Sequence, residues 1–593
     1  MAEGDLRVGI DVGGTNTDAV VLDASDRVIA KAKRPTTPDV TTGLRAALDA
    51  VLTELAQPGA SDRAPSGPHA GVPSGPPSGG PGGVPSGPPS GGAYGMEGGV
   101  VWGRITRVML GTTHATNAIL ERRNLGRVAV LRLGAPATTA VPPLVGWPAD
   151  LREVVSAGEA IVPGGHYVDG REIGPLDPDA IRRFLDGVRA DAVAVTGVFS
   201  PAGDEHERAV EELVRREYGL PVSMSHEIGS LGLLERENAT VLNAALYTVA
   251  GHVTQALTSA LAERGLSARP YLAQNDGTLM TVEHAARLPV STIGSGPANS
   301  LRGAALLSGV QDAIVADVGG TSTDLGVLVG GFPRESAAAV EIGGVLTNFR
   351  MPDILAIALG GGSVVRDGAV GPDSVGYRIA EEALLFGGGT ATLTDAAVAG
   401  GRLPRGVSGW RERLEAVLAE RREAVPAERG SAGQGSAERG PGGRRGVGDM
   451  SEDIRDTLQR ALAVADALAL DAVDRMSLGR ADRPLVAVGG GAFLLPERIP
   501  GVSRVIRPEH AAVANAVGAA IALASGRVDT IMPAGESRSK AIERVKEEAV
   551  ARAVAAGADP AGVQIVDLLE VPLSYLSEPA VRVHVKAAGP LTR

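Results

Sequence analysis

The chain carries one octapeptide pattern twice, and this repeat limits the folds that it can adopt. DVGGTNTD occupies residues 11–18 and DVGGTSTD occupies residues 317–324, with seven of eight positions identical. An apolar run precedes each copy, at 8–10 and 314–316, and an apolar pair follows each, at 21–22 and 327–328. Each aspartate is therefore predicted to end a buried strand, and each Gly-Gly pair to form the tight turn into a second strand.

Such a hairpin is suited to holding a polyphosphate. Its backbone N–H groups can point at phosphate oxygens, and its threonine hydroxyls can donate as well. The leading carboxylates can hold Mg²⁺ directly or through water. Asp11 and Asp317 are therefore the predicted catalytic and metal-binding residues. The predicted phosphate contacts are Gly13, Gly14, Thr15, Asn16 and Thr17 in the first copy and Gly319, Gly320, Thr321, Ser322 and Thr323 in the second.

Three further glycine-rich turns follow apolar runs and are predicted to lie near the same ligand. Residues 486–496, VAVGGGAFLLP, place Gly489, Gly490 and Gly491 directly after a predicted strand. Glycines at such a point let the backbone approach a flat ligand closely. The other two turns contain Gly296 in GSGPANS, and Gly361 with Gly362 in LGGGS. Ordinary turn chemistry is the alternative interpretation for both.

The rest of the chain alternates short β-branched runs with helical patterns, which predicts an α/β fold with buried strands. One helix is predicted over 235–262, and a helix followed by two strands over 536–586. Residues 59–100 are rich in Gly, Pro and Ser and contain GVPSGPPSGG twice, so we expect a disordered insertion there. Residues 425–449 predict a second, flexible loop.

Composition excludes several classes of function. The net charge of −12 argues against non-specific binding to nucleic acid or to an anionic membrane. The absence of cysteine removes disulfides, thiolate metal sites and iron–sulfur clusters. The uncharged stretch 239–262 holds too many polar residues for a membrane span, and the N-terminus has no signal-peptide pattern. We therefore expect a cytoplasmic protein.

In the order DVGGTNTD, DVGGTSTD, VGGGAF, the motifs resemble those of the actin, sugar-kinase and heat-shock-chaperone ATPase superfamily. That resemblance implies two duplicated ribonuclease-H-like domains that close over ATP. Four further segments make the resemblance more specific, because they are similar to the hydantoinase A/oxoprolinase family, and the similarity runs from about residue 6 to 525. These segments are GTTHATNAILER, HEIGSLGLLERENATVLNAAL, GSGPANSLRGA and DILAIALGGGS. The resemblance implies an N-terminal domain over 1–200, a hydantoinase A-type domain over 201–530 and a small C-terminal α+β appendage over 531–593.

Members of this family use ATP to open cyclic amides such as hydantoins, 5-oxoproline and lactams. The resemblance therefore implies an ATP- and Mg²⁺-dependent cyclic amidohydrolase with a small-molecule substrate. It also implies a separate B-type subunit, and we expect an oligomer. A subunit of an ATP-dependent ketone carboxylase is one alternative, and a conformational ATPase like actin or the chaperones is another. Leu355 and Ala356 stand where many members carry a polar residue, which leaves any additional metal site there open.

Several other polar groups have two possible interpretations. The segment 112–117, TTHATN, could contact the acceptor substrate or cap the helix that follows. Residues 235–238, EREN, could serve a site or complement the dipole of their helix. Asp18 and Asp324 could contact the ligand or bond within the hairpins. The remaining histidines, including His166, His226 and His252, show no metal-ligand spacing and are expected to be structural.

Overall fold

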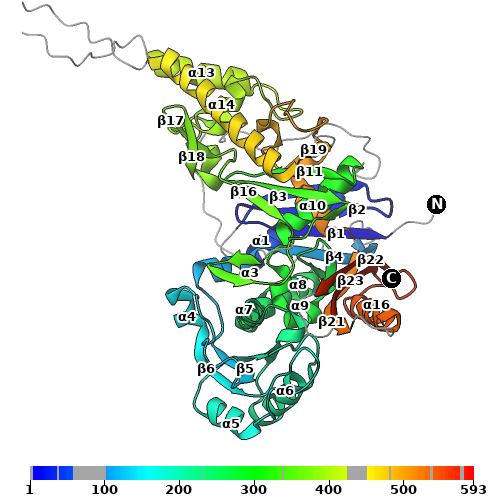
Figure 1. Ribbon diagram of the computed structural model, residues 1–593. Coiled ribbons are helices and arrows are strands. Elements are labelled where there is room, and N and C mark those ends of the chain that lie inside the picture. The colour runs from blue at the N-terminus through cyan, green and yellow to red at the C-terminus, as the bar shows by residue number, and fades with distance from the viewer. Residues whose placement is uncertain are drawn as a thin grey trace, which may run out of the picture.

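The described residues form three larger sheets and two sheets of two strands, with helices packed around them (Figure 1). The two-stranded sheets pair β14 Val340–Ile342 with β15 Val345–Thr347, and β17 Ser363–Arg366 with β18 Ala369–Ser374. The computed structural model describes residues 5–36, 39–57, 102–229, 231–336, 339–423, 450–477, 479, 483–521, 523–533, 538–573 and 580–592. The insertion predicted at 59–100 and the loop predicted at 425–449 lie outside these residues. Within the described part, no helix is both long and apolar enough to cross a membrane.

The first repeat lies near one edge of the largest sheet. Its described strands run in the order β22-β23-β21-β10-β9-β4-β1-β2-β3. β2 and β3 are antiparallel neighbours, whereas β4 is parallel to β1 and β9 is parallel to β4. The bounds are β1 Leu6–Val12, β2 Asn16–Leu22, β3 Val28–Pro35, β4 Ile105–Thr112, β9 Arg269–Ala273, β10 Leu279–Thr281, β21 Leu523–Pro533, β22 Gln564–Leu573 and β23 Ala580–Pro590.

The second repeat lies in a sheet of the same construction. Its main path is β13-β12-β11-β19-β20, in which β11 and β12 are antiparallel and β19 and β20 follow in parallel. β16 also pairs with β12. The bounds are β11 Ala313–Val318, β12 Thr323–Val329, β13 Phe332–Pro333, β16 Ile354–Ile357, β19 Leu485–Val488 and β20 Val505–Ile506. The two sheets thus share the strand order expected of duplicated ribonuclease-H-like domains.

A third sheet, at the bottom of Figure 1, consists of β6-β5-β7-β8 and is parallel throughout. Its central strands, β5 and β7, are mostly apolar and buried because helices cover them on both sides. The strand bounds are β5 Val128–Ala135, β6 Ser156–Pro163, β7 Ala192–Gly197 and β8 Val222–Met224. Its helices are α4 Ala149–Val155, α5 Pro178–Asp186, α6 Glu205–Tyr218 and α7 Leu233–Ala245.

Most of the remaining helices cover the two repeat-bearing sheets, whereas α3 packs in the core of the third sheet and α13 in a separate small cluster. Those of the first sheet include α1 and α8, whose buried side chains share its core, together with α16. α12 and α14 contribute to the core of the second sheet. The bounds are α1 Val40–Leu55, α3 His114–Glu121, α8 Tyr247–Glu263, α9 Val282–Arg287, α10 Ser295–Ser308, α11 Ile379–Glu382, α12 Leu393–Ala399, α13 Trp410–Glu423, α14 Met450–Ser477, α15 Ala514–Ala519 and α16 Arg538–Ala555.

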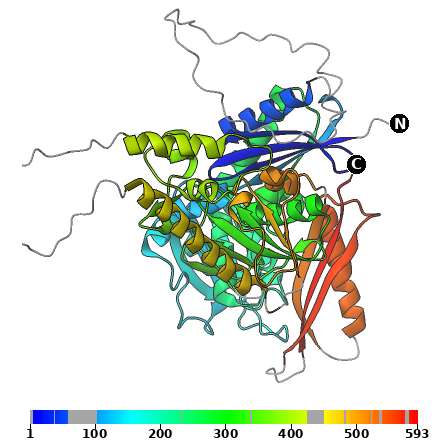
Figure 2. The same ribbon diagram turned by 90° about the horizontal axis from the view of Figure 1, so that it is seen from above.

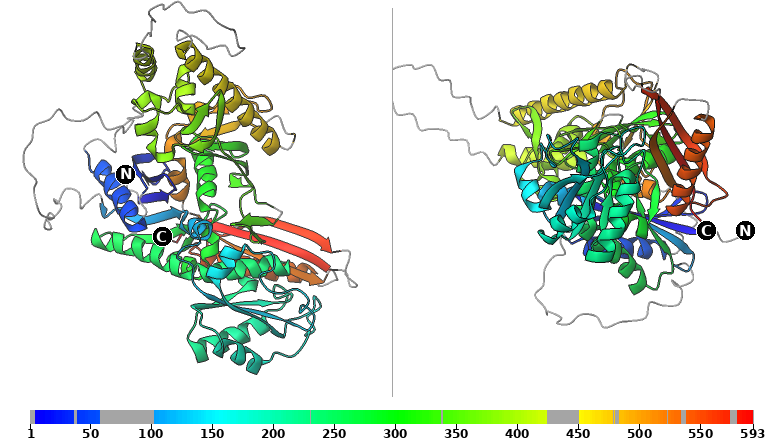
Figure 3. Two further views of the ribbon diagram at one scale, coloured as in Figure 1. Left: turned by 90° about the vertical axis from the view of Figure 1, so that its left-hand side faces the viewer. Right: turned by 60° about the horizontal axis from the view of Figure 1, so that its bottom comes forward.

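Two elements differ from the sequence prediction. The single helix expected over 235–262 is divided into α7 and α8 at Leu246, whose N–H bonds the carbonyls of both Leu242 and Asn243. The C-terminal strands do form where predicted, but β21 and β23 pair along eleven residues and extend the first sheet. Figures 2 and 3 show α16 lying along these strands, which project to one side of the molecule.

Candidate functional site

The first hairpin places two carboxylates side by side. Asp11 near the end of β1 pairs directly with Asp18 on β2, and both are buried. The turn between the strands is closed by a hydrogen bond from the Gly13 N–H to the Asn16 carbonyl, at 3.0 Å. The hydroxyl of Thr36, beyond β3, donates to the Gly13 carbonyl at 2.8 Å. The predicted strand, turn and second strand are therefore all present.

The second hairpin repeats this geometry. Asp317 pairs with Asp324, and the Gly319 N–H donates to the Ser322 carbonyl at 2.9 Å. Here the supporting segment is the glycine turn at 360–362. Its N–H groups at Gly361 and Gly362 donate to the carbonyls of Gly319 and Gly320 at 3.0 and 2.7 Å. The predicted glycines of this turn thus lie directly against the second hairpin.

One helix joins the two hairpins. On α10, the Asn299 amide donates to Asp11 Oδ1 at 3.1 Å, and the adjacent Ser300 hydroxyl donates to Asp317 Oδ2. Because these residues are consecutive, α10 fixes the positions of the two aspartates relative to each other. Both lie in the GSGPANSLRGA segment, although the sequence alone did not distinguish them from its glycines.

The second helix at the site, α15, donates its side-chain hydrogen bonds to the first hairpin. The Asn515 amide donates to Asp11 Oδ2 at 3.0 Å and to Asp18 Oδ2 at 2.9 Å. The Lys33 ammonium lies 2.9 Å from Asp18 Oδ1. The Asp18 carboxylate is therefore paired with a lysine, whereas the Asp324 carboxylate accepts no hydrogen bond within the described residues. The matching positions of the two repeats are not equivalent.

The carboxylates are held in an environment that favours their neutral form. The pKa of Asp11 is raised to about 7, mainly by burial and in part by the negative charge of Asp18, whereas the hydrogen bond from Asn299 acts to lower it. Burial likewise raises the pKa of Asp317. Burial and the neighbouring Asp317 raise the pKa of Asp324 to about 6. A bound cation would reverse these shifts, because it stabilises the charged forms.

The donor atoms fit Mg²⁺, which prefers oxygen ligands and keeps several waters. Asp11 and Asp317 supply carboxylate oxygens. Asn299 Oδ1 is buried and has no hydrogen-bond partner in the described part of the chain, so it is a free oxygen beside Asp11. Among the described residues, no three of the hairpin carboxylates have oxygens within 4.8 Å of one another, so water would have to complete the shell.

A different cluster, of two histidines and a glutamate, comes closer to the arrangement of a metal site. Among the described residues, the ligand atoms of His166, Glu172 and His206 lie within 4.8 Å of one another. The fold thus joins histidines that are far apart in sequence. However, the Gly165 N–H donates to His206 Nδ1 at 3.0 Å, so the ring proton is on Nε2, which lies 3.4 Å from Glu172. In this arrangement neither ring nitrogen of His206 is free to bind a cation.

The other predicted glycines line the two hairpins. A side chain at Gly489 would collide with Asp317 Oδ1, because its Cβ would lie 2.3 Å from that atom. Gly111 has the same relation to Asp11, at 2.1 Å, and the sequence prediction missed it. Gly491 bonds the Val318 carbonyl at 2.8 Å, Gly490 adjoins it, and Gly296 lies in the first turn of α10 near Thr113.

The two ambiguous polar segments are resolved differently. Thr113 precedes α3 but its side chain does not cap the helix, and it bonds the Val12 carbonyl at 3.2 Å instead. His114 lies beside Thr112, and burial lowers the pKa of His114. In the other segment, Glu237 forms a buried ion pair with Arg132, and Asn238 accepts a hydrogen bond from Trp147. Residues 237 and 238 are therefore structural.

Comparison with known proteins identifies the family. The hydantoinase/oxoprolinase model matches residues 236–528, and the hydantoinase/oxoprolinase N-terminal region matches 7–64 and 95–218. The chain is 30% identical over 265 residues to the acetophenone carboxylase gamma subunit of Aromatoleum aromaticum, covering 40% of this chain and 36% of that one. It is 27% identical over 443 residues to the caprolactamase subunit alpha of Pseudomonas jessenii, covering 68% and 56%.

Solved structures agree on the fold. The ATP-dependent caprolactamase of Pseudomonas jessenii matches with a TM-score of 0.69 and 20% identity, covering 99% of this chain and 87% of that one. A nucleotide-free acetone carboxylase matches with a TM-score of 0.61 and 16% identity, covering 100% and 88%. The matches to the two curated relatives span 36% and 56% of their lengths. With both family regions matched in order, the chain belongs to the hydantoinase/oxoprolinase family.

Proposed function

We propose that this chain is an ATP-dependent hydrolase subunit that phosphorylates a cyclic amide and helps to open its ring. The observation that carries the proposal is the link through α10, whose neighbouring Asn299 and Ser300 hold the aspartates of two equivalent hairpins. One Mg·ATP gripped from both sides would require such a fixed relation. The similarity to an ATP-dependent caprolactamase and its alpha subunit supports the assignment to cyclic amides.

The chemical logic follows from the poor reactivity of amides. The nitrogen donates electrons into the carbonyl, so water attacks it slowly. Transfer of the γ-phosphoryl group of ATP to the carbonyl oxygen releases ADP and gives a phosphorylated imidate. Water then attacks the ring carbon, the C–N bond breaks as the nitrogen takes up a proton, and a second water hydrolyses the resulting acyl phosphate to the carboxylate and phosphate. Phosphoryl transfer itself needs mainly positioning and charge neutralisation.

The residues of the hairpins would supply that positioning. Turn N–H groups at Gly14 and Gly320, and the hydroxyls of Thr15 and Thr321, are available to phosphate oxygens. Asp11 and Asp317 would hold Mg²⁺, directly or through water, and the ion would neutralise charge on the phosphates. Gly489–Gly491 would leave room for the adenosine. We further propose that a separate B-type subunit assists ring opening and that the protein forms an oligomer. The proposed domain bounds are 1–200, 201–530 and 531–593.

The test is a screen for substrate-stimulated ADP release. The chain, with its partner subunit, is supplied with MgATP and with hydantoins, 5-oxoproline or unsubstituted lactams. We expect at least one cyclic amide to accelerate ADP release, and the Asp317→Asn variant to lose at least about 100-fold of that rate. Asp312→Asn, an exposed aspartate at the start of the same region, is the matched control. If no cyclic amide stimulates ADP release, the proposal is wrong.

A ketone carboxylase subunit is the second candidate. The similarity to an acetophenone carboxylase gamma subunit favours it. In that reaction the phosphoryl group would go to a ketone enolate before carboxylation. A requirement for both a ketone and bicarbonate in ADP release would support this function, and turnover of a cyclic amide without bicarbonate would exclude it.

A further inference from the structure

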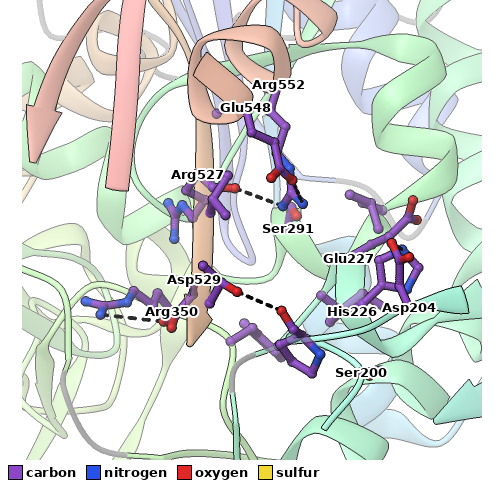
Figure 4. A pocket seen from close by; sticks show the side chains of 18 of the residues that line it. Ser200, Asp204, His226, Glu227, Ser291, Arg350, Arg527, Asp529, Glu548 and Arg552 are labelled. Atoms are coloured by element: carbon purple, nitrogen blue, oxygen red, sulfur yellow. Dashed lines mark hydrogen bonds and ion pairs between the residues drawn. The ribbon is translucent and has the colours of Figure 1, made fainter. Parts of the chain in front are cut away.

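A second candidate site lies outside the two hairpins. It is a cavity of about 720 Å³ between the third sheet, the C-terminal strands and the segment around residue 350 (Figure 4). This volume is typical of pockets for small molecules. Charged and polar side chains surround it, among them Asp204, His226, Arg350, Arg527, Asp529 and Arg552.

The cavity opens at the same sheet edge as the first hairpin. β1, β4 and β9 are parallel, so their carboxyl ends share one edge, and Gln274 and Asn275 of the cavity wall follow β9 directly. With neighbouring strands about 4.8 Å apart, β9 lies roughly 10 Å from β1. Asn275 Oδ1 also accepts the Gly294 N–H at 2.7 Å, at the start of α10. The cavity wall is therefore joined to the helix that holds Asp11 and Asp317.

Most arginines around the cavity are fully engaged by carboxylates. Arg527 lies 3.0 Å from Asp276 and 3.3 Å from Glu335, and Arg208 lies 2.7 Å from Asp204. Arg287 and Arg552 pair with Glu227 and Glu548. These side chains neutralise one another, so they do not select the charge of a ligand.

Arg350 is different. Its guanidinium makes no hydrogen bond within the described residues, and its two ion pairs are long, 3.7 Å to Glu335 and 4.0 Å to Asp529. Both acids have nearer cations, since Lys586 lies 3.4 Å from Glu335 and Arg582 lies 2.7 Å from Asp529. A guanidinium has five N–H donors in a fork that matches a carboxylate. Those of Arg350 remain available at the cavity.

Two imidazoles of the wall are also incompletely bonded. The ring nitrogens of the buried His584 lie 3.7 Å from Asp529 and 3.8 Å from Asp567, and Nε2 of His226 lies 3.4 Å from Asp204. Among the described residues none of these three nitrogens makes a hydrogen bond. Buried polar atoms normally have hydrogen-bond partners, so the cavity wall leaves polar groups to which a ligand or water could bond.

We infer that the cavity binds the phosphoryl acceptor, and that Arg350 selects a cyclic amide bearing a carboxylate. This inference rests on the proposed function. The carboxylate would lie on the guanidinium fork, and the ring carbonyl would face the carboxyl edge of β4 and the first hairpin. A neutral lactam would leave Arg350 without its partner, so it would bind more weakly.

The test compares two rings that differ only in the carboxylate. 5-Oxoproline and 2-pyrrolidinone are titrated in the ADP-release assay with wild type, Arg350→Met and Arg350→Lys. We expect Arg350→Met to raise KM for 5-oxoproline by about 10- to 100-fold with little change in kcat, and to leave KM for 2-pyrrolidinone unchanged. Arg350→Lys restores part of the loss, because it keeps the charge without the fork. Arg182→Met, an arginine paired with Glu217 on the outer face of α5, is the control.

Direct binding separates this inference from the proposed function. 5-Oxoproline is titrated calorimetrically into the chain without ATP, for wild type and for Arg350→Met. If 5-oxoproline binds through Arg350 but no amide stimulates ADP release, the proposed function is wrong and the carboxylate-binding site at Arg350 stands. Equal effects of Arg350→Met on both rings, a wild-type preference for 2-pyrrolidinone, or no binding of 5-oxoproline would overturn the inference.

Discussion

Each repeat places two aspartates directly opposite each other across a hairpin, where like charges destabilise a sheet. The first pair is compensated, because Asn515 donates to both carboxylates and Lys33 lies against Asp18. Within the described residues, the side chains of the second pair have one hydrogen-bond partner, the Ser300 hydroxyl on Asp317. When its carboxylates are ionised, the second pair is therefore less compensated than the first, which would favour a bound cation there.

This difference predicts the behaviour of Asp324→Asn. The pKa of Asp324 is raised from 3.8 to about 6, so in the wild type the folded state loses stability as the pH rises through this range. The amide carries no such charge. At pH 7 and without nucleotide, the variant should be more stable by on the order of 2 kcal/mol, since one pKa unit corresponds to about 1.36 kcal/mol. Thermal unfolding should show the gap closing as the pH falls from 6 towards 4. A gap that is constant between pH 4 and 8 contradicts this explanation.

At the scale of elements, the site depends on how closely α10 and α15 cross. A Cβ on Gly303 would lie 1.8 Å from the Ala514 carbonyl oxygen, and one on Gly518 would lie 1.8 Å from that of Asn299. The backbones of the helices thus touch at the residues that hold the first aspartate. Glycine is required here for the close approach and not for a special backbone angle.

The crossing predicts opposite effects for two glycine substitutions. Gly518→Ala should destabilise the chain by about 1–3 kcal/mol through overpacking, and it should also weaken Mg·ADP binding because it displaces Asn299. Gly251→Ala, inside α8 with no atom within 4 Å of the new Cβ, should stabilise by about 0.5–1 kcal/mol. Chemical denaturation and nucleotide titration measure both effects. Equal stability changes in the two variants would argue against a tight crossing.

Local pattern was enough to predict the hairpins but not their surroundings. The strands and turns around both repeats follow from apolar runs and Gly-Gly pairs, which act over a few residues. The role of Asn299 depends on a partner 288 positions away, and that of Asn515 on one 504 positions away. The division of the 235–262 helix and the extension of the first sheet by β21–β23 are also long-range. The residue patterns of the C-terminal strands would fit a separate domain equally well.

At the scale of the molecule, the proposed function makes the two repeat-bearing sheets the two halves of one nucleotide site. They share a strand order, and α10 lies between their central aspartates. The cavity beside Arg350 extends this arrangement to the third sheet and the C-terminal strands. Binding of a nucleotide to one half alone would not need the link through α10, whereas binding to both halves would stabilise the whole chain together.

Ligand-induced stabilisation tests this directly. At a concentration of 100 times Kd, Mg·ADP should stabilise the wild type by about 2.7 kcal/mol in a single unfolding transition. If one nucleotide contacts both hairpins, as proposed, Asp11→Asn and Asp317→Asn should each abolish most of the shift. The exposed Asp5→Asn and Asp312→Asn, which precede the same two strands, should retain it. Calorimetric scans with and without Mg·ADP distinguish the cases. If either hairpin variant keeps the full shift, the nucleotide is held by one half only, and the link through α10 serves stability instead of catalysis.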